Sequence, residues 1–176
     1  MSGTETLSRL KSSKCNEWYT PEEHLRLIRT VLRTIDLDPA SNSNNTTGAR
    51  TAFTEVDGDK SWQPVSLGGL PWIGNTYCNP PYGGLAGKFA YKMLQEYGCG
   101  RVTSGILCLS GYAYETRWFR PILVDINIPI CWVHGRVSFV KQDGTRRAST
   151  VGTVYVYLGS EPEIFKATFG QIGTVR

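Results

Sequence analysis

The sequence lacks a long apolar run: no stretch approaches the roughly 18–20 apolar residues that a membrane-spanning helix needs. Its first residues also lack the apolar region of a signal peptide. The chain contains only two histidines, and its five cysteines are scattered without a Cys-x-x-Cys pair. These absences argue against a membrane protein, a metal centre and a disulfide framework. We therefore expect a soluble intracellular protein with reduced thiols and no bound metal.

An excess of negative charge is also missing, and the positive excess is confined to one half of the chain. The net charge is +4. Residues 1–100 carry 10 basic and 10 acidic residues, whereas residues 101–176 carry 9 basic and 5 acidic residues. A basic half favours a polyanionic partner such as nucleic acid, although a solvated basic face has the same composition.

Hydrophobic spacing predicts helices that alternate with short strands. Thr20-Pro21 is typical of a helix start, with Thr20 as the N-cap and Pro21 at the first helical position of an amphipathic segment. Further helices are predicted over residues 86–97 and 115–123. Strands are predicted at residues 35–37 (ending in a turn at 38–41), 52–54, 72–78, 102–109, 128–134 and 136–141.

The end of this pattern predicts a hairpin. Asp143-Gly144 is a typical two-residue turn, and the return strand is predicted over residues 149–158. Helices and apolar strands that alternate before a closing hairpin favour an α/β fold, with a mostly parallel sheet and a C-terminal antiparallel hairpin. The polar residues 1–14 are expected to be a mobile tail, and residues 15–176 to form one domain.

The most informative motif is Asn79-Pro80-Pro81-Tyr82, which directly follows a predicted strand. Open α/β sheets bind ligands at the carboxyl ends of their strands. Two prolines stiffen the loop, so the side-chain oxygen of Asn79 and the carbonyl of Pro80 can accept both hydrogens of one amino group. An amino group conjugated to a purine or pyrimidine ring would become pyramidal between these two acceptors. Its lone pair would then be free to attack a methyl donor. Tyr82 offers a flat face on which a base removed from its duplex can stack.

Asn-Pro-Pro-Tyr is the catalytic motif of amino-group methyltransferases, and three further segments resemble parts of one branch of them. The segments are Trp18-Tyr19-Thr20-Pro21, Leu37-Asp38-Pro39-Ala40-Ser41 and Gly135-Arg136-Val137-Ser138-Phe139. Together they resemble the phage-type, Dam-like DNA N6-adenine methyltransferases, from about Trp18 to about Leu158. The resemblance implies a Rossmann-like fold that uses S-adenosylmethionine, without a separate target-recognition domain. It implies methyl transfer to N6 of a flipped adenine in DNA, in the cytoplasm (of the host, if a phage encodes the chain).

The resemblance also implies the roles of individual residues. The catalytic residues would be Asn79, Pro80, Pro81 and Tyr82. The residues that would bind the cofactor are Trp18, Thr20, Pro21, Asp38, Pro39, Ala40 and Asp57. Asp38 would face the amino group of the methionine end, and Asp57 is favoured over Glu55 and Asp59 for the ribose or adenine. The residues that would contact DNA are Tyr82, Phe139, Arg136, Arg146 and Arg147.

Several alternatives stay open at this point. Phe139 could equally be a core side chain of the sheet, and Arg146 and Arg147 could be a solubilising hairpin tip. The motif is shared by enzymes that methylate cytosine N4 in DNA, RNA, or protein glutamine. A non-catalytic DNA-binding accessory protein would explain the basic half, but it would not explain a rigid Asn-Pro-Pro-Tyr loop. Both a monomer and a homodimer are compatible with the sequence.

Overall fold

The computed structural model describes residues 18–54, 66–81, 83–125 and 127–176. The helices are α2 (Glu22–Leu32), α3 (Ala86–Gly98), α4 (Arg120–Val124), α5 (Pro162–Phe169) and the 3-10 helix η2 (Gly111–Glu115). The strands are β1 (Leu37–Ser41), β2 (Thr51–Thr54), β3 (Gly74–Cys78), β4 (Val102–Ser110), β5 (Ile130–Val133), β6 (Ser138–Val140), β7 (Arg146–Ala148), β8 (Thr153–Leu158) and β9 (Gly173–Val175). The expected tail at 1–14 lies outside the described residues. No helix within the described ranges is long and apolar enough to cross a membrane.

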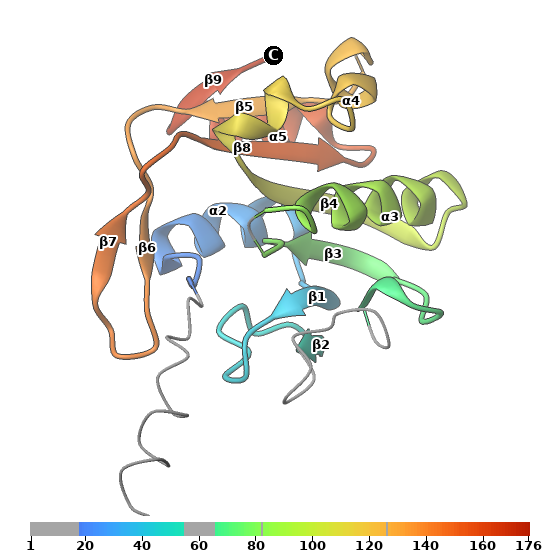
Figure 1. The fold of residues 1–176 in the computed structure, drawn as a ribbon. Coiled ribbons are helices and arrows are strands. Elements are labelled where there is room, and N and C mark those ends of the chain that lie inside the picture. Colours follow the sequence, from blue (N-terminus) through green and yellow to red (C-terminus); the bar gives the residue numbers. More distant parts are fainter. Residues whose placement is uncertain (1–17, 55–65, 82, 126) are drawn as a thin grey trace, which may run out of the picture.

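A seven-stranded sheet in the order β2-β1-β3-β4-β8-β5-β9 forms the centre of the molecule (Figure 1). The first four strands pair in parallel, whereas β8, β5 and β9 add in antiparallel pairings. The predicted α/β class is therefore confirmed, with a sheet that leans towards parallel. Strands β3 and β4 and helix α3 lie where the apolar runs predicted them.

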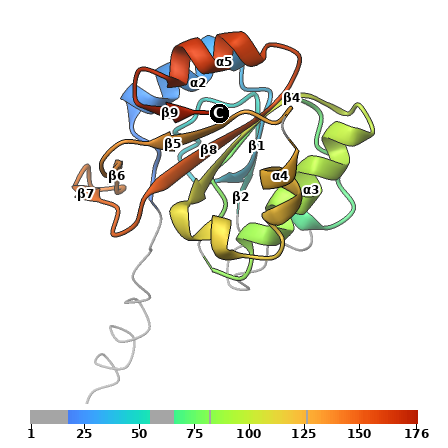
Figure 2. The ribbon, with the colours of Figure 1, turned by 90° about the horizontal axis from the view of Figure 1, so that it is seen from above.

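Helices cover both faces of the sheet, α2 and α5 on one and α3 and α4 on the other (Figure 2). Because side chains alternate along a strand, each strand supplies both layers of the core. The side chains packed with α2 and α5 include Tyr77, Ile106, Cys108, Tyr155 and Tyr157. Those packed with α3 and α4 include Cys78, Leu107, Leu109, Val154 and Val156. The alternation explains why β4 is buried without interruption from Gly105 to Leu109.

The C-terminal hairpin is smaller than the sequence predicted. β6 pairs with β7 as a separate two-stranded sheet that projects beside the main one (Figure 1), and Val140 of β6 also forms an isolated bridge with Tyr19. The predicted return strand over 149–158 was wrong, because residues 153–158 form β8 between β4 and β5. All side chains of β8 are buried, whereas those of β7 are exposed, so the two segments belong to different environments.

Two boundaries near the N-terminal motifs also differ from the prediction. α2 begins at Glu22 with Pro21 as its N-cap residue, and Thr20 does not cap it. The first strand begins at Leu37 and includes the Asp-Pro-Ala segment that was predicted to be a turn. A proline lacks the N–H for a ladder bond, and the pairing of β1 with β2 is accordingly irregular between Asp38 and Ser41.

The sequence predicts no helix or strand after Leu158, but the structure has α5 and β9 there. α5 packs against α2, and its rings Phe165 and Phe169 stack on each other at 4.5 Å between centroids. β9 then pairs with β5 and forms one edge of the sheet. α5 thus completes the layer that covers one face of the sheet, and β9 completes the sheet itself.

Candidate active site

The two strands that carry the sequence motifs, β1 and β3, are neighbours in the sheet. From β1 the chain moves outward to β2 and then crosses back to β3 on the other side of β1. Such a switch point leaves a crevice at the carboxyl ends of the two strands. Leu37 pairs with Thr76, so Asp38 is level with Tyr77, and Asn79 follows two residues later. The fold thus brings the Asp-Pro-Ala and Asn-Pro-Pro segments together.

Asp38 is a buried carboxylate, with 3% of its surface exposed. Its Oδ1 accepts a hydrogen bond from the backbone N–H of Ala40 at 3.1 Å, and its Oδ2 accepts one from Oγ1 of Thr47 at 2.9 Å. Burial raises the pKa of Asp38 to about 6, and the hydrogen bonds only partly oppose this. Its hydrogen-bond partners are neutral, so the ionised carboxylate would be stabilised further by a cation.

The segment before α2 holds the side chain of Asn79. Nδ2 of Asn79 donates to the carbonyl of Trp18 at 3.4 Å. Because the amide nitrogen is engaged, its oxygen points elsewhere and can accept a hydrogen bond. Thr20, two residues after Trp18, is also attached to β3. Its hydroxyl lies 2.6 Å from the hydroxyl of Tyr77, and both side chains are buried. The beginning of the described chain is therefore fixed to β3 on both sides of the strand's end.

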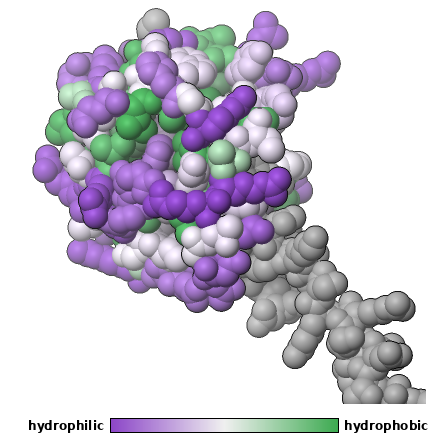
Figure 3. Space-filling model, turned by 90° about the vertical axis from the view of Figure 1, so that its left-hand side faces the viewer, coloured by the Kyte–Doolittle hydropathy of each residue, from purple (hydrophilic) through white to green (hydrophobic). Residues whose placement is uncertain are grey.

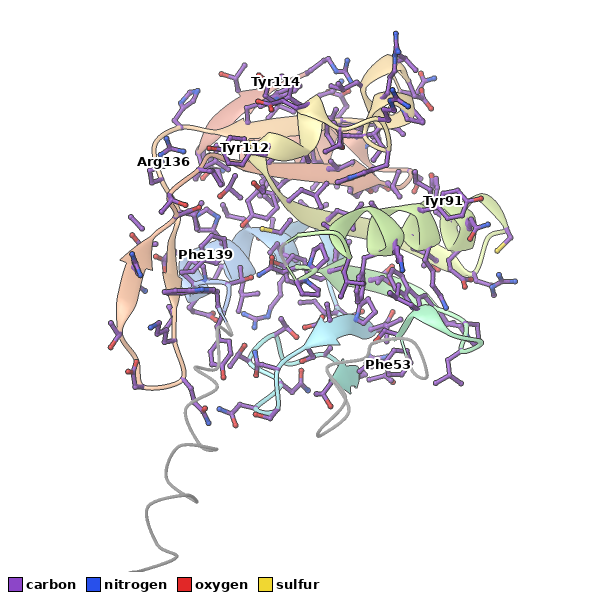
Figure 4. The ribbon with its side chains drawn as sticks, viewed as in Figure 1. Phe53, Tyr91, Tyr112, Tyr114, Arg136 and Phe139 are labelled. Carbon is purple, nitrogen blue, oxygen red and sulfur yellow. The ribbon has the colours of Figure 1, made fainter. Side chains whose placement is uncertain are left out.

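A cavity of about 640 Å³ opens beside the Asn-Pro-Pro loop. Its walls come from the end of β4, the following 3-10 segment, the start of α3, the hairpin and the residues after it. The lining residues are Trp18, Pro80, Gly83, Ala86, Cys108, Leu109, Ser110, Tyr112, Ala113, Thr116, Trp118, Phe139, Arg147, Ala148, Ser149, Thr150 and Val151. Figure 4 shows Phe139 and Tyr112 on the same side of the molecule, and Figure 3 shows hydrophobic surface bordered by hydrophilic residues on the face that carries the hairpin.

The structure brings four of the predicted site residues to this cavity: Trp18, Pro80, Phe139 and Arg147. Phe139 and Arg147 face each other across the hairpin, which explains why both reach the same wall. Phe139 is also packed in the core, as one of its two predicted roles requires, and its role towards a base stays a prediction.

The other predicted residues do not line this cavity. Those in described segments are Thr20, Pro21, Asp38, Pro39, Ala40, Asn79, Pro81, Arg136 and Arg146. Arg136 lines a smaller concavity of about 330 Å³ with His24 and His134. Tyr82 and Asp57, with Glu55 and Asp59, lie outside the described residues.

Arg146 is directed away from the cavity. Its Nη1 and Nη2 donate to the two carboxylate oxygens of Glu23 at 2.7 and 3.0 Å. This bidentate pair joins the hairpin to the first turn of α2, and it lowers the pKa of Glu23 because the guanidinium favours the ionised carboxylate. The two adjacent arginines of the hairpin therefore have different surroundings.

Sequence reasoning missed two aromatic residues of the cavity wall, Tyr112 and Trp118. Tyr112 is 62% exposed, although it is large and apolar over most of its surface. The position of Trp118 depends on Gly87, because a Cβ there would lie 2.8 Å from its Cδ1. Only the tertiary fold places the rings of these two residues in the same cavity wall as the hairpin.

The family described as DNA N-6-adenine-methyltransferase (Dam) matches residues 7–161 of the chain. A comparison with curated proteins finds no match. The family match covers most of the sequence, including both strand-end motifs and the hairpin. The chain therefore belongs to the DNA N-6-adenine-methyltransferase family, whose activity is the methylation of adenine N6 in DNA.

Proposed function

We propose that this protein transfers a methyl group from S-adenosylmethionine to N6 of an adenine that has been turned out of duplex DNA. The observation that carries the proposal is the aromatic-lined cavity beside Asn79 and Pro80, in a chain of the DNA adenine methyltransferase family. A pocket of several hundred Å³ lined by flat side chains suits a single base with its sugar.

The order of the central strands supports a Rossmann-like methyltransferase fold. The chain reverses its direction of winding between β1 and β3. In the proposed function this switch point would separate a cofactor half of the sheet from a substrate half. Residues 15–176 would then form one methyltransferase domain, and selectivity for a DNA sequence would come from loops around the cavity.

The residues at the end of β1 suit the methionine end of the cofactor. Asp38 is a buried carboxylate whose hydrogen-bond partners are neutral, and an ammonium group would supply the missing positive charge. Thr20 and Ala40 would lie beside it, and Pro39 keeps the backbone close. S-adenosylmethionine supplies an activated methyl group on its sulfonium.

The residues at the end of β3 suit the target amino group. The amide nitrogen of Asn79 is held by the Trp18 carbonyl, so its oxygen would accept one hydrogen of the adenine amino group. The carbonyl of Pro80 would accept the other, and the nitrogen lone pair would then point at the methyl donor. Trp118, Phe139 and Tyr82 would enclose the base, each ring contributing on the order of 1–3 kcal/mol where it stacks.

The test is methyl transfer from labelled S-adenosylmethionine to DNA, RNA and protein, followed by analysis of the labelled nucleosides or amino acids. The proposal expects N6-methyladenine in DNA. Label in N4-methylcytosine, RNA or glutamine would contradict it and support one of the related enzymes. Binding of DNA without cofactor binding or transfer would instead identify an accessory DNA-binding protein.

A further inference from the structure

The β6–β7 hairpin forms one wall of the cavity, yet its own structure gives it little support. Each strand has three residues, and every side chain of β7 is exposed. Phe139 is the buried anchor within these strands, with 2% of its surface exposed. A two-stranded ribbon of this length is not stable by itself, so its position depends on contacts with the rest of the protein.

Three contacts attach the hairpin to one short segment, residues 18–23. The backbones of Tyr19 and Val140 exchange two hydrogen bonds, of 2.7 and 2.9 Å. Nζ of Lys141 lies 5.0 Å from the centre of the Trp18 ring, within the range of a cation–π interaction. The third contact is the bidentate pair between Arg146 and Glu23.

The same segment also holds the catalytic loop, because the carbonyl of Trp18 accepts a hydrogen bond from Asn79. The hairpin wall and Asn79 are therefore fixed to one common support. The Glu23–Arg146 pair is exposed, at 52% and 53% of the two side chains, and such pairs contribute little to global stability. The pair is nevertheless bidentate, and its two hydrogen bonds fix the orientation of the Arg146 guanidinium as well as its distance from Glu23.

We propose that Glu23 and Arg146 are a positioning pair, which holds the hairpin in place so that Phe139 and Arg147 meet the extruded base and its phosphate. Arg146 itself does not contact DNA. This inference rests on the proposed function, because it assigns the cavity to a base of DNA. Of the two adjacent arginines of the hairpin, Arg147 thus binds the substrate and Arg146 supports the cavity wall.

The experiment compares Glu23→Gln, Arg146→Gln and the double reversal Glu23→Arg with Arg146→Glu. The measurements are kcat and KM for DNA methylation, DNA affinity, cofactor affinity and thermal unfolding. A positioning pair predicts that both single variants lose at least about fivefold in kcat/KM for DNA, while cofactor affinity and the unfolding temperature stay near those of the wild type. The double reversal should recover most of the loss.

A direct contact between Arg146 and phosphate predicts the opposite sign for Glu23→Gln. Removal of the acidic partner would free Arg146 and strengthen DNA binding. Unchanged or tighter DNA binding in Glu23→Gln therefore overturns the proposal, as does a double reversal no better than the single variants. Lys166→Gln is the matched control, because it breaks the exposed pair with Glu163 on α5 and should leave kcat/KM unchanged. Absence of methyl transfer by the wild-type protein would refute the proposed function instead, so the two failures can be told apart.

Discussion

The ends of β1 and β3 are neighbours in the sheet, but they are built from different chemistry. The end of β1 places a buried carboxylate among hydroxyl and backbone N–H donors. The end of β3 opens into a cavity whose walls are mainly aromatic and small apolar side chains, with Arg147 among them. A charged site with fixed hydrogen bonds selects a charged group, whereas flat apolar walls select a flat ring.

In the proposed function, this difference would keep the cofactor at the β1 end and the base at the β3 end of the same crevice. A base placed at the β1 end would leave the Asp38 carboxylate without a counter-charge, which is costly in a buried position. A zwitterion placed at the β3 end would lose its hydration against apolar walls. The substitutions below disturb one end at a time, in order of decreasing expected effect.

Asn79→Ala should have the largest effect, because it removes the acceptor for the target amino group. We expect kcat to fall by roughly 10²–10³-fold, the loss typical when one polar contact to a reacting group is removed. Cofactor affinity should stay within a few-fold, since Asn79 belongs to the β3 end. Single-turnover methylation and calorimetry measure the two quantities, with the exposed Asn127→Ala as the control. An active Asn79→Ala enzyme would rule out this loop as catalytic.

Asp38→Asn should affect the β1 end alone. The lost charge-assisted hydrogen bond should weaken S-adenosylmethionine binding by roughly 1.5–3 kcal/mol at neutral pH. Because burial raises the pKa of Asp38 to about 6, the wild-type carboxyl becomes protonated below that pH, and its affinity for a cationic group should fall as the pH drops from about 7 to 5. The variant should lack this pH dependence, which calorimetry at several pH values would measure.

The same raised pKa predicts a stability effect without cofactor. The folded state binds the Asp38 proton more tightly than the unfolded state. The contribution of this carboxyl to the free energy of unfolding therefore falls as the pH rises from about 4 to 6. Asp38→Asn should therefore gain stability relative to the wild type across that range. A difference between the two unfolding temperatures that does not change with pH would contradict an elevated pKa for Asp38.

Gly87→Ala should affect the β3 end through packing. The new methyl group would meet the Trp118 ring at 2.8 Å and push it from the cavity wall. Since stacking on one ring contributes about 1–3 kcal/mol, kcat/KM for DNA should fall roughly tenfold, although alanine favours the helix itself. Gly98→Ala, in the same helix with nothing within 4 Å of the added Cβ, is the matched control. Equal kinetics in both variants would place the base away from Trp118.

Arg147→Ala should have the smallest effect, visible in the salt dependence of DNA binding. Loss of one phosphate contact should reduce the slope of log affinity against log salt by about 1. Fluorescence anisotropy over a salt series measures the slope, and Lys166→Ala on α5, outside the hairpin, serves as the control. An unchanged slope in Arg147→Ala would move the path of the DNA backbone away from the hairpin.

The central elements were predictable because their signals are local. The apolar run of β4, the helix after Gly84 and the Asn-Pro-Pro loop each follow from a few consecutive residues. α5 also carried readable signals, because Pro162 occupies its first turn and Phe165 and Phe169 are four residues apart.

The rest depended on tertiary structure. Ser149–Leu158 reads as one continuous strand, and only the pairing partners divide the hairpin from β8. The cavity walls were not readable either, since Trp18, Trp118 and Phe139 are far apart in the chain. The division between Arg146 and Arg147 required the position of Glu23, which lies more than a hundred residues earlier.

Cys108 at the cavity wall has a consequence for the safety of the reaction. A sulfonium reactive enough to methylate a weakly nucleophilic base amine would alkylate a nearby thiolate more readily. Burial raises the pKa of Cys108 to about 12, so the thiol stays protonated at neutral pH. Mass spectrometry after long incubation with S-adenosylmethionine should accordingly find Cys108 unmodified. A cysteine in the cavity wall is thus compatible with the proposed methyl transfer, because its thiol is protonated.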